Sequence, residues 1–72
     1  MRRRELLRRI RRAARSARPR RSCHVAREGA SHSVYQCGET RFTLPRHVEI
    51  NEFTASAIMR LLEAELGEEW WR

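Results

Sequence analysis

The residues with the clearest chemical potential lie in EGASHSVYQC, residues 28–37, where a glycine-containing turn precedes His32. A histidine titrates near neutrality, so one side chain can take a proton from an attacking hydroxyl and return one to a leaving group. Gly29 permits a tight turn and close approach of a ligand to the backbone, and Arg27 and Arg41 are suited to phosphate oxygens. A lone histidine on a strand is more often merely solvated. The basic, glycine-containing surroundings are what favour a role in proton transfer.

Five side chains in the sequence are potential metal ligands, namely Cys23, His24, His32, Cys37 and His47. Their spacing contains no C-x-x-C or H-x(3-5)-H pair, and adjacent strand residues such as Cys23 and His24 point to opposite faces. The chain also has no aspartate, no G-x-S-x-G motif, no Walker loop and no G-x-G-x-x-G motif. We therefore expect neither a metal nor a cofactor.

Charge is distributed unevenly along the chain. Residues 1–27 hold twelve arginines against one glutamate, a formal charge of +11, whereas residues 28–72 hold four arginines against eight glutamates, a charge of −4. Phosphates are the natural partners of the basic half, because neutralising them releases counterions. An anionic membrane or an acidic protein would satisfy the same charge.

The apolar segments of the sequence are short. None approaches the roughly 20 residues needed to cross a bilayer, and none follows the basic start as a secretory signal requires. We therefore expect an intracellular, cytoplasmic chain that does not enter a membrane, with Cys23 and Cys37 as thiols. A turn near Gly29 and Ala30 would bring the two cysteines opposite one another, so a disulfide is sterically conceivable.

The sequence predicts an amphipathic basic helix over residues 4–17. Its apolar residues recur at three- and four-residue spacing: Leu6, Leu7, Ile10, Ala13, Ala14 and Ala17. Arg18-Pro19 ends the helix, and residues 18–22 form a basic linker. An Arg-rich amphipathic start also resembles a mitochondrial transit peptide or a membrane-surface helix, but this one supplies apolar residues that a small domain needs.

Three strands are predicted at residues 23–27, 32–37 and 41–44, each bounded by turn residues or by Pro45. A second helix follows, with Asn51 as its N-cap and Gly67 as its stop. Its predicted apolar face consists of Phe53, Ala57, Ile58, Leu61, Leu62 and Leu66. We expect Trp70 and Trp71 to cover an edge of the core, or alternatively to anchor a partner.

These elements predict a single α+β domain over residues 1–72, with the order α-β-β-β-α. Both helices should cover one face of a three-stranded antiparallel sheet, because a domain this small buries one thin core. The other face of the sheet and the loop edges are then left for function.

Residues 29–50, GASHSVYQCGETRFTLPRHVEI, resemble the HicA family of toxin ribonucleases from bacterial type II toxin-antitoxin systems. The family pattern is a glycine turn, then Ser/Arg-His-x-x-Tyr/Phe on a strand, then a strand ending in Val/Leu/Ile-Pro-x-His and a helix. Ser31-His32-Ser33-Val34-Tyr35 and Leu44-Pro45-Arg46-His47 match its two motifs. Ala30 stands where the family usually has glycine, and arginine replaces the lysines common around its site.

The resemblance implies a fold similar to the double-stranded RNA-binding domain and a metal-independent endoribonuclease, an mRNA interferase, whose catalytic histidine is His32. It also implies a HicB-type antitoxin protein as partner. The phosphate-binding charge is expected from Arg27, Arg41 and Arg46. Ser31 and Tyr35 are further expected RNA contacts, Tyr35 either stacking on a base or packing in the domain.

His47 is a possible auxiliary residue beside this expected site. Two other classes of function stay open for the chain. The first is a non-catalytic RNA-binding module of the same fold. The second is a basic interaction domain whose first helix and terminal tryptophans, Trp70 and Trp71, bind an acidic protein.

Overall fold

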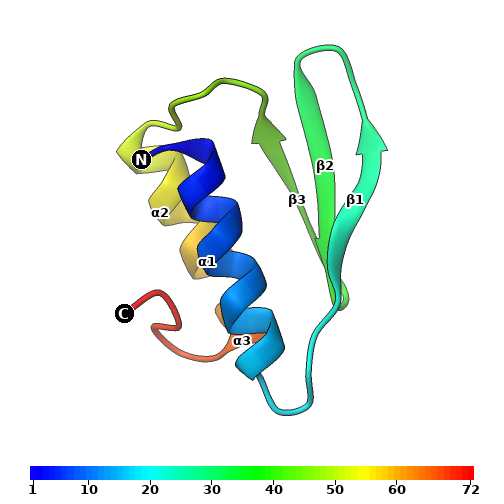
Figure 1. Ribbon diagram of the computed structural model, residues 1–72, viewed down its shortest axis with the longest axis vertical. Coiled ribbons are helices and arrows are strands. Elements are labelled where there is room, and N and C mark those ends of the chain that lie inside the picture. Colours follow the sequence, from blue (N-terminus) through cyan, green and yellow to red (C-terminus); the bar gives the residue numbers. More distant parts are fainter.

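A computed structural model describes all residues of the chain, 1–72, and the predicted α-β-β-β-α order is confirmed. The elements are α1 (Arg3–Ser16), β1 (Cys23–Glu28), β2 (His32–Cys37), β3 (Thr40–Pro45), α2 (Glu52–Leu61) and α3 (Glu63–Leu66) (Figure 1). The one addition is a break at Leu62, which divides the second predicted helix into α2 and α3. None of the helices combines the length and apolar composition needed to cross a bilayer.

The three strands form one antiparallel sheet in the order β1-β2-β3. Two residues, Gly38 and Glu39, connect β2 to β3. Gly38 has a φ of +58°, in the left-handed region that hairpin turns of this length require. A Cβ atom at this position would also collide with the carboxylate of Glu65. Glycine is therefore the one residue that this turn accommodates without strain.

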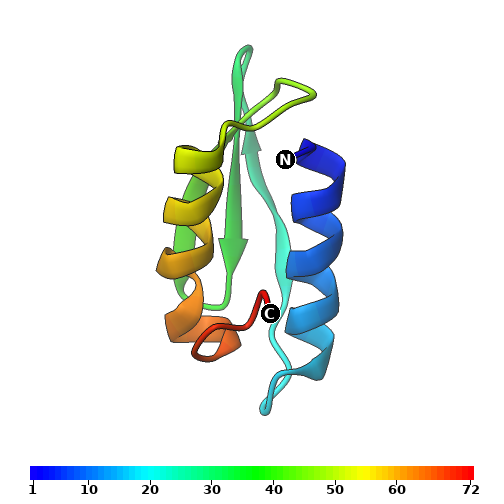
Figure 2. The same ribbon diagram turned by 90° about the vertical axis from the view of Figure 1, so that its left-hand side faces the viewer.

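The two long helices lie side by side over one face of the sheet, as predicted (Figures 1 and 2). Alternate strand residues are buried beneath them, namely Ser33, Tyr35 and Cys37 from β2 and Phe42 and Leu44 from β3. The intervening residues point to the opposite side because successive strand side chains alternate between faces. This opposite side, which no helix covers, is called the open face below.

Helix α1 is an integral part of the domain. It buries Leu6, Leu7, Ile10 and Ala14 against the sheet and the second helix, at the predicted spacing. The Ala17 N–H donates to the Ala13 carbonyl, and the helix ends there because Pro19 cannot extend the ladder. Without this basic segment, the sheet would lose the apolar cover that these four residues provide.

The buried face of α2 differs from the predicted one. Asn51 caps the helix, as predicted, by accepting a 2.8 Å hydrogen bond from the Thr54 N–H. The buried residues of α2 and α3, however, are Ala55, Ile58, Met59, Leu62 and Leu66. Phe53 is 86% exposed and Ala57 and Leu61 are also exposed, so their predicted core role is wrong. Ile50, just before the helix, is buried, whereas Phe53 in its first turn faces solvent.

The tryptophans near the C-terminus pack against the core, as expected. The Trp70 Nε1–H donates a 2.8 Å hydrogen bond to the Met59 carbonyl. Trp71 lies edge-to-face against Trp70, with ring centroids 5.8 Å apart. Both rings are partly buried, so they also leave surface for contact with other molecules.

Cys23 and Cys37 form a disulfide, so the expectation of free thiols is wrong. The two residues are register partners at one end of the β1-β2 pair, with Cα atoms 4.1 Å apart and both side chains on the helix side. The turn at Gly29 and Ala30 pairs the two strands so that these cysteines lie opposite one another.

Candidate nucleic-acid interface

An irregularity in β1 determines which face of the sheet carries Arg27. Val25 lies opposite Tyr35, but the register then shifts so that Arg27, not Ala26, lies opposite Val34. Regular alternation from Val25 would have turned Arg27 toward the helices. The extra residue, Ala26, shifts the alternation of side chains by one position. Arg27 therefore shares the open face with Val34. Arg27 has no ion-pair partner in the structure.

His32 is the first residue of β2 and lies opposite Pro45 at the end of the sheet. Its side chain is exposed, while the next residue, Ser33, is fully buried on the helix side. The Gly29 N–H donates a 2.8 Å hydrogen bond to the His32 carbonyl. A Cβ atom on Gly29 would lie 3.0 Å from that oxygen, tighter than ordinary contact. The turn therefore holds the His32 backbone closely and leaves the imidazole on the open face.

The loop before His32 is also held by the residue that follows β3. The Arg46 N–H donates to the Ser31 carbonyl at 3.0 Å, and its guanidinium donates to the Gly29 carbonyl at 3.1 Å. The same guanidinium forms a 3.2 Å ion pair with Glu28. About half of each side chain in this pair remains exposed. Arg46 therefore lies at the predicted site, but Glu28 offsets part of its charge.

The open face carries no acidic side chain. Its residues are His24, Arg27, His32, Val34, Gln36, Arg41, Thr43 and Pro45. Arg41 lies at the far end, where its Nε donates a 2.9 Å hydrogen bond to Gln36. Its register partner, Gln36, is four residues from His32 along β2, which is roughly 13 Å at the usual rise of a strand. Arg41 is therefore on the predicted face but is not brought together with His32.

Tyr35 belongs to the core rather than to the interface. Its side chain is 7% exposed, and its ring stacks on Phe42 with centroids 5.6 Å apart and planes 14° apart. The ring points to the helix side of β2, on the opposite face from His32. Of the two roles considered for Tyr35, packing is the one that this position supports. Ser31, in contrast, is exposed in the loop beside His32.

A basic groove lies between the start of α1 and the segment after β3. Its volume is about 440 Å³. We call it the arginine groove and define it by its basic lining residues, namely Arg2, Arg3, Arg4, Arg11, Arg46 and His47. Arg46 connects this groove to the loop that precedes His32. The arginines from α1 were not among the predicted site residues, because only long-range packing brings them beside Arg46.

The other histidines do not cluster with the cysteines. No three His, Cys, Asp or Glu side chains gather closely enough to hold a metal ion.

Comparison of the chain with protein-family models, with curated proteins and with solved structures found no match.

Proposed function

We propose that this chain is a metal-independent endoribonuclease that cleaves mRNA and acts as the toxin of a HicA-type toxin-antitoxin pair. One observation carries the proposal. The exposed His32 lies at the end of an acid-free sheet face, with Arg27 on the neighbouring strand and Arg46 beside its loop. This arrangement agrees with the Ser-His-x-x-Tyr and Leu-Pro-x-His motifs that resemble the family.

The proposed reaction uses a nucleophile that RNA itself contains. His32 takes the proton from a 2′-hydroxyl, whose oxygen attacks the adjacent phosphorus, and the bond from phosphorus to the 5′-oxygen breaks. His32 then returns the proton to the departing 5′-oxygen. The products are a 2′,3′-cyclic phosphate and a 5′-hydroxyl. Arg27 and Arg46 stabilise the additional negative charge on the phosphorane.

The arginine groove gives the substrate strand a path toward His32. Exposed guanidinium groups attract the phosphate backbone and hold it without reading its sequence. Arg46 contributes to this groove and to the loop before His32, so a strand in the groove passes close to the histidine. The proposed substrate is therefore single-stranded mRNA.

A HicB-type antitoxin is the proposed protein partner. An acidic surface on such a protein would complement the open face, where His24, Arg27 and Arg41 are exposed without acidic neighbours. Covering His32 in this way would exclude the substrate. The partner would then neutralise the chain by occupying the RNA-binding surface.

The alternative function is RNA binding without cleavage. The feature that favours it is Ala30, which stands in the loop beside His32 where the family usually has glycine. A side chain at this point restricts how closely the RNA backbone can approach. Such a module would have the same charge distribution and fold but would leave RNA intact.

Tightly controlled expression of the wild-type, His32→Ala and His24→Ala chains tests the proposal. His24→Ala is a matched control because His24 is an exposed histidine at the other end of the open face. We expect growth arrest and loss of full-length mRNA with wild type and His24→Ala, and neither effect with His32→Ala at equal protein level. Arrest and mRNA loss with His32→Ala would contradict the proposed role of His32.

A further inference from the structure

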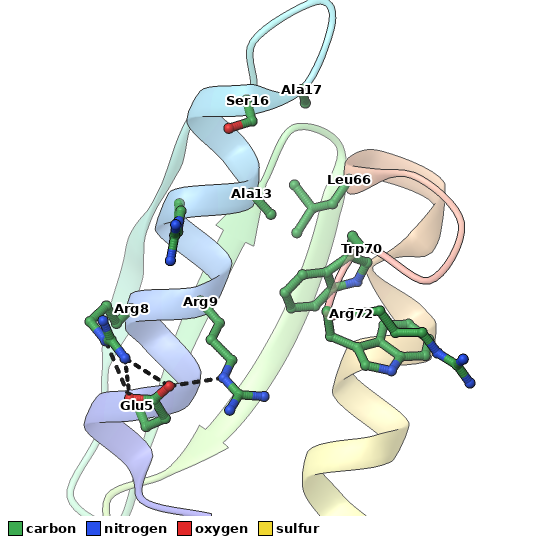
Figure 3. A pocket seen from close by; sticks show the side chains of 11 residues that line it. Glu5, Arg8, Arg9, Ala13, Ser16, Ala17, Leu66, Trp70 and Arg72 are labelled. Carbon is green, nitrogen blue, oxygen red and sulfur yellow. Dashed lines mark hydrogen bonds and ion pairs between the residues drawn. The ribbon is translucent and has the colours of Figure 1, made fainter.

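A second groove lies on the helix side of the molecule, away from the open face (Figure 3). Its volume is about 640 Å³, and it runs between α1 and the segment that follows α3. We call it the tryptophan groove and define it by Arg8, Arg9, Arg12, Trp70, Trp71 and Arg72. It shares no residue with the arginine groove, so it is a separate candidate binding site.

The apolar part of the tryptophan groove is firmly positioned. Trp70 is fixed by its hydrogen bond to the Met59 carbonyl, and Trp71 packs against it. Leu66 and Ala13 complete the apolar lining. Aromatic rings held in this way offer flat surfaces to a ligand without losing side-chain freedom when the ligand binds.

The rim of the tryptophan groove is positively charged. Glu5 is the one acidic residue in its lining, and it already accepts hydrogen bonds from Arg8 at 2.7 Å and from Arg9 at 2.9 Å. Arg72 pairs with Glu69 at 3.6 Å, where both side chains are mostly exposed. Arg12 has no ion-pair partner. The groove therefore combines aromatic surface with an excess of guanidinium groups.

Helix α1 connects this groove to the arginine groove. Arg4 and Arg11 line one flank of the helix, and Arg8 and Arg12 line the other. Arg15 is also exposed on the surface between them. A basic track thus crosses α1 from one groove to the other.

We propose that the tryptophan groove binds single-stranded RNA, with bases stacked on the tryptophan rings and a phosphate on Arg12, the rim guanidinium that has no ion-pair partner. This inference rests on the proposed function, because it takes RNA as the ligand. Aromatic surfaces combined with a basic path are how many proteins hold single strands without sequence preference. Exposed arginines on both flanks of α1 favour a long polyanion over a short acidic peptide. The groove holds the part of the RNA that extends away from the cleavage site at His32.

Intrinsic fluorescence gives a direct test, because the only two tryptophans of the chain both line this groove. The His32→Ala chain, which cannot cut RNA under the proposed mechanism, is titrated with an unstructured RNA of about 12 nucleotides, a length that one small domain can cover. We expect saturable quenching of tryptophan emission. A glutamate-rich peptide of similar charge is the comparison ligand and should leave the emission unchanged.

Two further substitutions in the same chain locate the contact. Arg12→Ala removes an exposed guanidinium without disturbing an ion pair, so the fold is preserved. It should weaken RNA binding about tenfold, the scale of one charge-assisted contact. The matched control Arg60→Ala removes the same charge from α2, outside both grooves, and should change binding less than about twofold.

Three results would overturn the inference. The first is RNA binding that leaves tryptophan emission unchanged, and the second is equal weakening by Arg12→Ala and Arg60→Ala. The third is quenching by the glutamate-rich peptide but not by RNA, which would make the groove a site for an acidic protein. Failure of the proposed function is scored separately, as absence of RNA cleavage by the wild-type chain.

Discussion

The hydroxyl of Ser33 donates a 2.6 Å hydrogen bond to the carboxylate of Glu28 across the β1-β2 hairpin. Ser33 is fully buried, and its Oγ also accepts a 3.3 Å hydrogen bond from Arg3 of α1. The bond joins the two residues that follow Arg27 and His32 in their strands, on the helix side of the sheet. It thereby holds Arg27 and His32 on the open face.

Replacing Ser33 should loosen this end of the hairpin. Ser33→Ala removes a buried hydroxyl that both donates and accepts, so we expect the free energy of unfolding to fall by about 1–2 kcal/mol. Urea unfolding measures the change. Ser22→Ala is the control because its exposed hydroxyl makes no hydrogen bond, and it should have little effect. Equal stability of the Ser33→Ala and wild-type chains would show that the bond contributes nothing.

Arg27 should contribute more to RNA binding than an arginine outside the interface. It lies on the acid-free face without an ion-pair partner, so it can neutralise one phosphate. Arg27→Ala should reduce the slope of log affinity against log salt by about 0.7, the value for one contact with a single strand. Binding titrations at several salt concentrations measure the slope. If Arg60→Ala reduces it as much, the open face is not the interface.

Glu65 should make stability depend on pH. It accepts hydrogen bonds from the Thr40 hydroxyl at 3.0 Å, the Glu39 N–H at 3.3 Å and Arg21 at 3.0 Å. These bonds, that from Thr40 most strongly, lower the pKa of Glu65 below its usual value of about 4.5. The folded state therefore binds this proton more weakly than the unfolded chain. The stabilisation is present above pH 4.5 and is lost as pH falls through the lower, folded pKa.

Urea unfolding of Glu65→Gln tests this linkage. We expect a lower unfolding midpoint than wild type at pH 7 and a difference that shrinks as the pH falls below 4.5, since wild type loses the charge as the pH falls through its lower, folded pKa. Glu68→Gln serves as the control, because Glu68 is exposed and makes no hydrogen bond or ion pair. A difference between Glu65→Gln and wild type that does not change with pH would contradict the role of the carboxylate charge.

The Cys23–Cys37 disulfide should stabilise the hairpin. It closes a loop of 14 residues in sequence, for which the chain-entropy estimate is about 3 kcal/mol. Reductant should therefore lower the urea midpoint of the wild-type chain. The Cys23→Ala/Cys37→Ala chain should unfold at the same midpoint with or without reductant. A wild-type midpoint that is insensitive to complete reduction would show that the bond contributes no stability.

The elements of this fold were predictable from local patterns. The change from helical to alternating periodicity marks β2, whose observed bounds equal the predicted residues 32–37. Asn51 and Gly67 mark the helix termini because their chemistry suits a cap and a stop. Such signals depend on neighbouring residues alone, so no tertiary contact is needed to interpret them.

The features that were not predictable depend on contacts distant in sequence. The predicted and observed apolar faces of the second helix share Ile58, Leu62 and Leu66, and only packing against the rest of the domain decides which face is buried. The extra residue at Ala26 has no glycine or proline to mark it, yet it sets the direction of Arg27. The arginine groove likewise exists only because α1 packs beside Arg46.

The most direct test of the central claim is cleavage of a labelled RNA by purified wild-type, His24→Ala and His32→Ala chains in the presence of a metal chelator. The account predicts that wild type and His24→Ala produce fragments ending in 2′,3′-cyclic phosphate and 5′-hydroxyl. His32→Ala should still bind the RNA but leave it intact, as should wild type with an RNA lacking the 2′-hydroxyl at the cut site. Cleavage by His32→Ala at the wild-type rate would contradict the account.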